Sequence, residues 1–404
     1  MSTSLLYHTC GIVGYRYVHT KYQEGRVTFR IEQPRELLRC ADCGSDDLWI
    51  RGRTDRTFRF LSIGSKPVLV SMDVPRVECF RCSAVKQVKI GFADPKKRYT
   101  RSFERYALEL SRRMTIKDVA RHLQASWDTI KEIQAANLWR RFGKPKLSKL
   151  REIAIDEIAI GKGHHYLTVV LDLCSGAVVF VGDGKGVEAL TPFWKRLGRA
   201  RGKVRAVATD MSKAYIRAVR ENLPKAVHVF DHFHVVKLFN DKLSAFRRLL
   251  YHEASSNEER AILKGTRWLL LKNPENLEED RNEVERLQEA LKLNEPLAVA
   301  YYLKEDLRQI WWQPDKSTAR RVLRDWIARA RASGIRMLMQ FADTLEDHSE
   351  GILNYYDYQI STGPLEGTNT KIQLMKRQAY GYRDVEFFKL KILGIHETKR
   401  ALVG

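Results

Sequence analysis

The sequence predicts an α/β protein of several domains, in which a β-rich module and a helical module precede a mixed sheet flanked by helices. Three observations support this prediction. Strand-like stretches lie between two Cys-x-x-Cys pairs, a basic segment with helical periodicity follows, and strands then alternate with helices before a long helical region. A chain of 404 residues is also too long for one ordinary hydrophobic core, so roughly two to four domains are expected.

The composition indicates a folded protein with an anionic partner. Hydrophobic residues make up 44% of the chain and aromatic residues 10%, which is enough for sizeable cores. The 71 Lys and Arg against 49 Asp and Glu give a net charge of +22, so we expect a nucleic acid as the partner. The helix-turn-helix described below makes double-stranded DNA the expected form. An acidic membrane surface is the alternative, but no apolar run approaches the roughly 20 residues that span a bilayer, and the N-terminal segment lacks a signal-peptide core. We therefore expect a cytoplasmic, nucleoid-associated protein.

Residues 26–94 are expected to form a zinc ribbon. Cys40 with Cys43, and Cys79 with Cys82, have the two-residue spacing that lets both sulfur atoms of a pair bind one tetrahedral metal ion, for which Zn²⁺ is the natural choice. The 35 residues between the pairs predict a β-hairpin that brings the pairs together. The alternative is two unrelated buried cysteine pairs, which the paired spacing disfavours.

Residues 95–147 are expected to form a helix-turn-helix DNA-binding domain. Between residues 96 and 149 the chain has 15 Lys and Arg against five Asp and Glu, a net charge of +10. Ala120 occupies the position where two such helices need a small residue, Ser126 can cap the second helix, and Gln124 replaces the usual turn glycine. The residues expected to be exposed toward the major groove are Trp127, Asp128, Lys131 and Gln134. The alternative is a packed helix pair with no role in DNA binding.

The remainder of the chain predicts an RNase H-like α/β domain with an all-helical insertion. Three strand-like runs come first, and helices and strands then alternate, which is the element order of that fold. Strand periodicity is absent from about residue 244 to 355, where Asn273-Pro274, Gln313-Pro314 and Ser333-Gly334 separate helices. The expected boundaries are 148–243 for the first part of the core, 244–355 for the insertion and 356–404 for the C-terminal helices of the core.

Three carboxylates are candidates for a catalytic metal site. Asp156 lies inside an apolar strand and Asp210 ends another, where a charge costs free energy unless it has a metal ion or a partner. In the RNase H topology these two positions are adjacent, and Glu366 at a polar helix start could complete the site. Such oxygen ligands suit Mg²⁺, with Mn²⁺ as a possible substitute, and two ions about 3.5 to 4 Å apart can activate both sides of a phosphate transfer. Single carboxylates at strand ends are common, so only the combination is informative.

Several stretches of the sequence resemble the bacterial insertion-sequence transposases of the ISL-three family. They are Asp156 with the following HHYLTVVLDLCSG, then TDMSKAY around Asp210, LPKAVHVFDHFHVVK, and STGPLEGTNTKIQLMKRQAYGYRD around Glu366. The cysteine pairs and the helix-turn-helix also fall where that family has them, and the likeness covers roughly residues 35–395. The resemblance implies the DDE class, with Asp156, Asp210 and Glu366 as the catalytic triad, and the transposition of an element bounded by inverted repeats.

Other polar and aromatic residues have two interpretations each. Glu157 points to the face of its strand opposite the predicted catalytic aspartate, so we assign it a structural role. Asp231 can cap the helix that follows it, and His234 can contact DNA or the active site, or be a satisfied histidine at a helix start. Trp311-Trp312 could stack on a flipped base, although a buried aromatic pair between helices is the preferred interpretation.

Basic residues beyond Glu366 are expected to hold DNA phosphates, with a solvated face as the alternative; they are Lys371, Lys376 and Arg377. We therefore hypothesise a Mg²⁺-dependent DNA transposase that binds terminal inverted repeats, cleaves DNA and transfers strands. Because two transposon ends must be held together, a homodimer or larger assembly on DNA is expected. The rival classes are a catalytically inactive DNA-binding regulator and an RNase H-like structure-specific nuclease.

Overall fold

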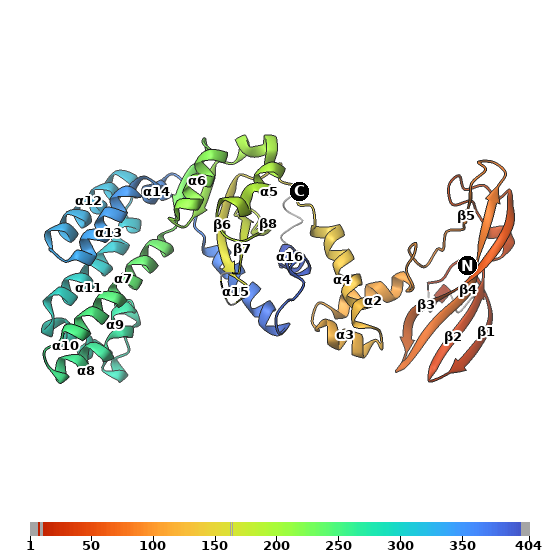
Figure 1. Cartoon of the computed structure of the whole chain (residues 1–404), viewed down its shortest axis with the longest axis horizontal. Coiled ribbons are helices and arrows are strands. Elements are labelled where there is room, and N and C mark those ends of the chain that lie inside the picture. The colour runs from red at the N-terminus through yellow and green to blue at the C-terminus, as the bar shows by residue number, and fades with distance from the viewer. Residues whose placement is uncertain (1–6, 9–10, 162, 164, 397–404) are drawn as a thin grey trace. The chain divides into compact units, whose positions relative to one another are not determined.

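The computed structural model describes residues 7–8, 11–161, 163 and 165–396, and the whole chain is traced in Figure 1. The chain divides into two compact units, residues 1–141 and 142–404. The division falls next to Gly143-Lys144-Pro145, where the pattern of the sequence changes from helices to strands. Within the described ranges, no helix is both long enough and apolar enough to cross a membrane.

The first unit begins with a β-sheet whose strands pair in the order β1-β2-β4-β3, with β5 added next to β4. β1 precedes residue 26, where the sequence placed the start of this domain, and it pairs antiparallel with β2. Almost all of its side chains are exposed, so its sequence lacks the alternating apolar pattern that identifies a half-buried strand. The strands are Arg16–Gln23 (β1), Arg26–Glu32 (β2), Leu48–Ile63 (β3), Lys66–Cys79 (β4) and Val85–Gln87 (β5).

β3 and β4 form a long antiparallel hairpin, which confirms the hairpin predicted between the cysteine pairs. Its ladder runs from Leu48 opposite Cys79 to Ile63 opposite Lys66. The apolar side chains of the hairpin build the core of the sheet; they include Phe58, Phe60, Val68, Val70, Met72 and Val74, all at most 4% exposed. The hairpin therefore has an apolar core of its own, and the cysteine segments lie at its open end.

Helices α2 (Arg101–Leu110), α3 (Ile116–His122) and α4 (Trp127–Phe142) follow the sheet. Side-chain oxygens cap the start of each helix by accepting a backbone N–H bond, and the predicted cap of α4 is confirmed by Thr129 N–H, which donates to Ser126 Oγ at 3.1 Å. Ala120, at the position where the helices need a small residue, is buried with Leu123, Ile130 and Ile133. The helix-turn-helix predicted from the sequence is therefore present.

Arg59 and Gln124 connect the sheet to the helix-turn-helix within this unit. The Arg59 guanidinium on β3 donates to the carbonyl oxygens of Val68 on β4 (3.1 Å) and of Leu123 at the end of α3 (2.8 Å). Gln124 Nε2 donates to the carbonyl oxygen of Ser65 in the β3–β4 turn at 3.0 Å. The backbone of Gln124 has a φ of +47°, the left-handed conformation that the usual turn glycine adopts without strain. The motif therefore keeps its turn geometry without glycine, and the glutamine side chain adds a bond to the sheet.

Replacing Gln124 by alanine should destabilise the first unit more than replacing it by glycine. Both changes remove the bond to Ser65, but only glycine takes the positive φ without a Cβ clash, so we expect a difference of about 1 kcal/mol in the free energy of unfolding. Native-state hydrogen exchange of the α3 and α4 amides in the full chain measures this difference. Equal protection from hydrogen exchange in Gln124→Ala and Gln124→Gly would show that the positive φ of this turn does not lower the stability of the alanine variant.

The second unit contains a mixed sheet in the order β10-β9-β6-β7-β8. β6, β7 and β8 pair antiparallel, whereas β9 pairs parallel with β6 and β10 pairs parallel with β9. This arrangement is the RNase H-like order that the sequence predicts. The strands are Glu152–Ala159 (β6), Tyr166–Asp172 (β7), Ala177–Asp183 (β8), Ala206–Thr209 (β9) and Val227–Phe230 (β10).

Helices cover both faces of this sheet (Figure 1). One face packs through Ile153 and Val207 against α5 and α6, and the other packs through Ala154 and Ala208 against α15 and α16. Since successive side chains of a strand point to opposite faces, the even-numbered residues of β6 face α15. The four helices are Val187–Leu197 (α5), Lys213–Asn222 (α6), Gly363–Gln378 (α15) and Val385–Leu393 (α16).

Helices α7 to α14 form the predicted helical insertion around a separate apolar core. Trp326 is fully buried there, and its Nε1 donates to the carbonyl oxygen of Leu303 at 2.8 Å. The interpretation of Trp311-Trp312 as a buried pair is wrong for Trp312, which is 61% exposed, whereas Trp311 packs against this core. Both residues lie in a 3-10 turn, where neighbouring side chains point in different directions, so they cannot both be directed into the core.

The helices around this core are His232–Glu253 (α7), Asn257–Gly265 (α8), Arg267–Leu271 (α9), Glu283–Leu293 (α10), Glu295–Arg308 (α11), Lys316–Ala332 (α12), Arg336–Asp347 (α13) and Ser349–Leu353 (α14). The expected start of the insertion at residue 244 falls within α7. Short 3-10 turns lie at Arg35–Leu37, Gly198–Lys203, Pro274–Asn276, Glu279–Arg281, Gln309–Trp312 and Asn354–Tyr356.

Candidate functional site

The parallel strands β6, β9 and β10 place three aspartates at one level of the sheet. The strand registers align Ala154, Ala208 and Val229. Two residues further along these strands stand Asp156, Asp210 and Asp231. Asp231 N–H donates to the carbonyl oxygen of Thr209 at 3.1 Å, which extends the ladder to this level. The sequence placed Asp156 next to Asp210, and the register adds Asp231.

The alternation of side chains directs these aspartates toward α15. Ala154, Ala208 and Val229 belong to the core that contains Leu365 and Ile372 of α15, and residues two apart on a strand point to the same face. The predicted third carboxylate, Glu366, lies in the first turn of α15. Segments far apart in the sequence therefore bring their carboxylates to one face of the sheet.

Glu366 lies close to two residues that the sequence did not assign to the metal site, Asp231 and His234. Among the residues that the structure describes, Asp231, His234 and Glu366 have ligand atoms that all lie within 4.8 Å of one another. His234 Nε2 is 3.8 Å from Glu366 Oε1. The predicted triad of Asp156, Asp210 and Glu366 does not form a group by this criterion.

Asp156 is held in one orientation by hydrogen bonds to both of its oxygen atoms. Oδ1 accepts from the Glu157 backbone N–H and Oδ2 accepts from Asn369 Nδ2 of α15, both at 2.8 Å. Burial raises the pKa of Asp156 to about 6; the nearby His234 opposes this rise, and the charges of Glu157 and Asp210 add to it. A bound cation would remove the cost of keeping this carboxylate ionised.

Asp231 joins the start of α7 to the start of α15. Its Oδ1 accepts from Phe233 N–H as the predicted helix cap, and its Oδ2 accepts from the backbone N–H and the hydroxyl of Thr362. Burial acts to raise the pKa of Asp231, but the bonds from His232 and Thr362 outweigh burial and lower it. Burial, followed by the charge of Asp231, raises the pKa of Glu366. The two carboxylates therefore repel each other, and a divalent cation bound between them would offset this repulsion.

Glu157 has the structural role expected from its position. Its carboxylate accepts a hydrogen bond from the hydroxyl of Tyr215 on α6 at 2.7 Å, which places it on the sheet face opposite α15. Burial, together with the charge of Glu157, raises the pKa of Tyr215. Glu157 is thus separated from the metal-ligand candidates by the sheet itself.

The four cysteines form a compact cluster in the first unit. Their sulfur atoms all lie within 4.8 Å of one another, with Cys40 Sγ 3.6 Å from Cys82 Sγ and Cys43 Sγ 3.5 Å from Cys79 Sγ. These separations are far longer than a disulfide bond and close to the ~3.8 Å between sulfur atoms of a tetrahedral site with Zn–S bonds of about 2.3 Å. The donor set therefore fits a zinc ion.

The two cysteine segments have the same local geometry. The carbonyl oxygens of Cys40 and Cys79 accept bonds from Gly44 and Ser83, and both of these residues have positive φ values. The backbone N–H groups of Cys43 and, to a smaller extent, Asp42 lower the pKa of the Cys40 thiol to about 6. Such amide donors stabilise thiolates, which are the form that binds metal.

The face of α4 that was predicted to be exposed is buried at Gln134 and half-buried at Lys131. Trp127 is 47% exposed, Asp128 is exposed, and the Lys131 ammonium lies 5.2 Å from the Trp127 ring centre. The prediction that Gln134 is exposed is wrong, because only 5% of it is accessible. Gln134 lies four residues after buried Ile130, and this spacing places it on the inward face of the helix.

The comparison with protein families decides the nature of the second unit. Residues 153–392, which run from β6 to α16 and include Asp156, Asp210, Asp231 and Glu366, match the model of the DDE transposase domain of the ISL3 family. The chain belongs to the ISL3 family of DDE transposases. This is the family indicated by the sequence motifs, and its members are polynucleotidyl transferases. Residues 88–135 of the transposase also match the helix-turn-helix domain of transposase family ISL3.

Curated relatives extend this likeness over nearly the whole chain. The transposase is 32% identical over 391 residues to the transposase for insertion sequence element IS1001 of Bordetella parapertussis, and the match covers 95% of each chain. It is 31% identical over 386 residues to the transposase for insertion sequence element IS1557 of Mycobacterium tuberculosis, covering 89% of this chain and 86% of the relative. The β-rich region with its cysteine cluster therefore lies within the span shared with full-length transposases.

The basic residues predicted to hold phosphates lie on α15 with Glu366. Lys371 and Arg377 are exposed, and Lys376 is half-buried. Since Arg377 lies eleven residues after Glu366, close to three helical turns, it shares the side of α15 that carries the catalytic candidate. The helix therefore presents a cation on the side that carries Glu366.

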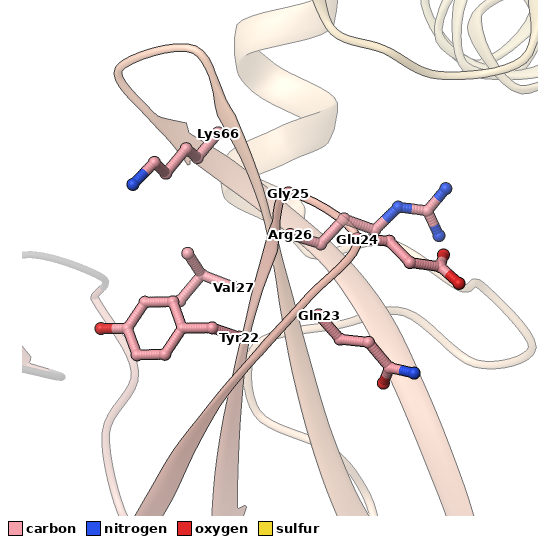
Figure 2. A pocket seen from close by; sticks show the side chains of 7 residues that line it. All are labelled: Tyr22, Gln23, Glu24, Gly25, Arg26, Val27 and Lys66. Carbon is pink, nitrogen blue, oxygen red and sulfur yellow. The ribbon is translucent and has the colours of Figure 1, made fainter.

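A pocket of about 260 Å³ lies apart from this chemistry, at the turn between β1 and β2. In Figure 2, Tyr22, Val27 and Lys66 lie on one side of the turn, and Glu24 and Arg26 lie on the other. The pocket contains none of the candidate metal ligands. A nucleic-acid substrate is bound along open surfaces rather than enclosed like a small molecule, so pocket size is a poor guide to the active site of a transposase.

Proposed function

We propose that this transposase binds the terminal inverted repeats of an insertion sequence, cleaves the DNA there and transfers the resulting strands to a target, with Mg²⁺ or Mn²⁺ held by Asp156, Asp210 and Glu366. The observation that carries the proposal is the common level of Asp156 and Asp210 on adjacent strands, on the sheet face that meets the first turn of α15. Asp231 and His234 stand beside Glu366 as further candidate ligands.

The protein residues in this proposal orient the metal site before DNA binds. Hydrogen bonds to both oxygen atoms fix Asp156, and the bond from Thr362 to Asp231 fixes the first turn of α15, on which Glu366 lies. Divalent ions bound there would activate the attacking water or 3′-hydroxyl and stabilise the leaving oxygen. Lys371, Lys376 and Arg377 would hold the phosphates of the DNA strand along α15.

A structural role for zinc completes the proposal in the first unit. One Zn²⁺ bound by Cys40, Cys43, Cys79 and Cys82 would fasten the segment before β3 to the end of β4. The bonds from Arg59 and Gln124 would then transmit this rigidity to the helix-turn-helix. We propose that the sheet and the helices recognise a transposon end together, and that two copies of the chain hold the two ends.

We also propose five functional segments within the two compact units. They are the zinc ribbon to residue 94, the helix-turn-helix at 95–147, the first part of the catalytic core at 148–243, the insertion at 244–355 and the C-terminal helices of the core from 356. The strand Arg16–Gln23 supports an earlier start for the zinc ribbon than residue 26. Residues 397–404 lie outside the described part of the last segment.

Replacing Lys131 by alanine tests the DNA-binding face of α4. We expect the affinity for duplex DNA carrying a terminal inverted repeat to fall by about ten-fold. If Lys131 contacts a DNA phosphate, the slope of log affinity against log salt concentration should also become smaller by about one. Binding isotherms at several salt concentrations, with repeat and scrambled duplexes, separate base recognition from phosphate contact. Lys292→Ala, which removes the same charge from α10 of the other unit, is the control. If Lys131→Ala bound DNA as tightly as the control, Lys131 would not be part of the DNA-binding surface.

The proposed reaction is tested with the DNA that flanks the gene. We expect inverted repeats on both sides, and we expect the purified chain with Mg²⁺ to cut a labelled duplex at the boundary of such a repeat. A protein that binds the repeat but never cuts it would be a regulator. A protein that cuts branched DNA and ignores the repeat would be a structure-specific nuclease. Either result would overturn the proposed function.

A further inference from the structure

Asn369 of α15 contacts the catalytic candidate Asp156 directly. Its Nδ2 donates to Asp156 Oδ2 at 2.8 Å, across 213 positions of sequence. In this orientation the amide oxygen, Oδ1, is buried and has no hydrogen-bond partner within the described part of the chain. A buried acceptor without a partner costs free energy, and such groups are found where a water molecule or an ion completes the site.

The position of Asn369 on α15 relates it to the metal-ligand candidates. It follows Glu366 by three residues, and Gln373 follows it by four, so the three side chains lie along one side of the helix. Gln373 Nε2 also bonds to β6, but to the backbone carbonyl oxygen of Ala159, at 2.8 Å. Gln373 therefore attaches the helix to the sheet without touching a carboxylate, whereas Asn369 contacts the carboxylate itself.

The two bonds to Asp156 act on different oxygen atoms. The backbone bond from Glu157 occupies Oδ1, and the side-chain bond from Asn369 occupies Oδ2, so rotation of the carboxylate breaks at least one of them. Each oxygen still has a free lone pair for a cation. A ligand whose direction is fixed before binding loses little freedom when the ion arrives, and partners that orient metal ligands commonly change metal affinity when they are removed.

We propose that Asn369 is a positioning residue of the catalytic centre, which orients the Asp156 carboxylate through Nδ2 and offers Oδ1 as an acceptor for water bound to the divalent ion. This inference rests on the proposed function in that it takes Asp156 as a metal ligand. It adds to the site a residue three positions after Glu366. It also assigns a use to an amide oxygen that has no partner among the residues that the structure describes.

The test measures metal binding separately from catalysis. Mn²⁺ is titrated against the zinc-loaded full chain and followed by electron paramagnetic resonance, which requires no turnover. We expect Asn369→Ala to weaken Mn²⁺ binding by about ten-fold or more and to lower the rate of cleavage at saturating DNA, with unchanged affinity for repeat DNA. Gln373→Ala, which removes a matched bond from α15 to β6, should leave Mn²⁺ affinity as in the parent.

The isosteric variant Asn369→Asp keeps the shape of the side chain and removes the donor. We expect it to slow cleavage because the new carboxylate repels that of Asp156. We expect this even if the new negative charge lets the variant bind Mn²⁺ as tightly as the parent. If Asn369→Ala binds Mn²⁺ and cleaves DNA as Gln373→Ala does, or if Asn369→Asp cleaves as fast as the parent, the inference is wrong. A parent that binds Mn²⁺ but never cleaves would instead refute the proposed function, and the Mn²⁺ titration would still decide the role of Asn369.

Discussion

Glu366→Gln should lower DNA cleavage and strand transfer by about a hundred-fold or more, and Asp156→Asn and Asp210→Asn should do the same. Each change keeps the shape of the side chain and removes the negative charge that would hold a divalent ion. Binding of repeat DNA should stay close to that of the parent, because the helix-turn-helix belongs to the other compact unit. Gel-shift and cleavage assays on the same preparations separate the two effects.

A neighbouring glutamate supplies a matched control for this prediction. Glu386 lies in the first turn of α16 as Glu366 lies in the first turn of α15, and its side chain is 81% exposed. Glu386→Gln should therefore keep full activity. If Glu366→Gln retained strand transfer with Mg²⁺, the third ligand would have to be another residue, and Asp231, which lies in the same cluster as Glu366 and His234, would be the first to test.

With metal absent, Asp156→Asn should change the stability of the fold little. Burial raises the pKa of Asp156 from 3.8 to about 6, so the ionised carboxylate opposes folding at neutral pH by at most about 3 kcal/mol. The amide removes that charge, but its NH2 group must face one of the two donors to the carboxylate, Glu157 N–H or Asn369 Nδ2. The two effects oppose each other, so the free energy of unfolding of Asp156→Asn should stay close to that of the parent. Denaturant titration in a chelator measures it. A large loss of stability would mean that Asp156 has a structural role in the fold and is not primarily a metal ligand.

Loss of zinc should have the second large effect. We expect one Zn²⁺ per chain, and Cys40→Ser should lose that ion and bind repeat DNA at least about ten-fold more weakly, because metal binding and folding are coupled at such sites. The apolar core of β3 and β4 should preserve part of the sheet, so the defect should concentrate in the cysteine segments and the helices attached through Arg59. Metal analysis and binding isotherms measure the two effects.

Cys174→Ser is the matched control for the zinc prediction. Cys174 is an exposed thiol between β7 and β8 of the other unit, outside the four-cysteine cluster. Its replacement should change neither the zinc content nor the binding of DNA. A purified parent without zinc, or a Cys40→Ser protein that folds and binds the repeat as Cys174→Ser does, would contradict the assignment of the cluster.

Strands and helices with regular apolar periodicity could be predicted because the spacing of their apolar residues identifies the buried face. β6 to β10 and α3 to α4 are of this kind. β1 could not be predicted in this way, since it is an exposed strand stabilised by pairing with β2 rather than by burial. Gln134 was misplaced because its polar side chain suggested an exposed position, although its spacing from Ile130 places it on the buried face of α4.

The acidic site was predictable in part for a related reason. Charges inside apolar strands identify Asp156 and Asp210 from local sequence. The approach of Asp231 and His234 to Glu366 depends on the register of β10 against β9 and on the placement of α15, which are tertiary features. Asn369 carried no local signal at all, because an asparagine in a polar helix is common and its contact with Asp156 spans the whole insertion.

Strand transfer by the purified parent is the most direct test of the central claim. A labelled duplex that ends in the terminal repeat with a free 3′-hydroxyl is incubated with the zinc-loaded chain, a supercoiled plasmid and Mg²⁺. We expect a plasmid joined covalently to the labelled 3′ end, with formation of this product dependent on Mg²⁺ and absent from Glu366→Gln. Binding of the labelled end without any joined product, under conditions in which the zinc content and the fold are intact, would contradict it.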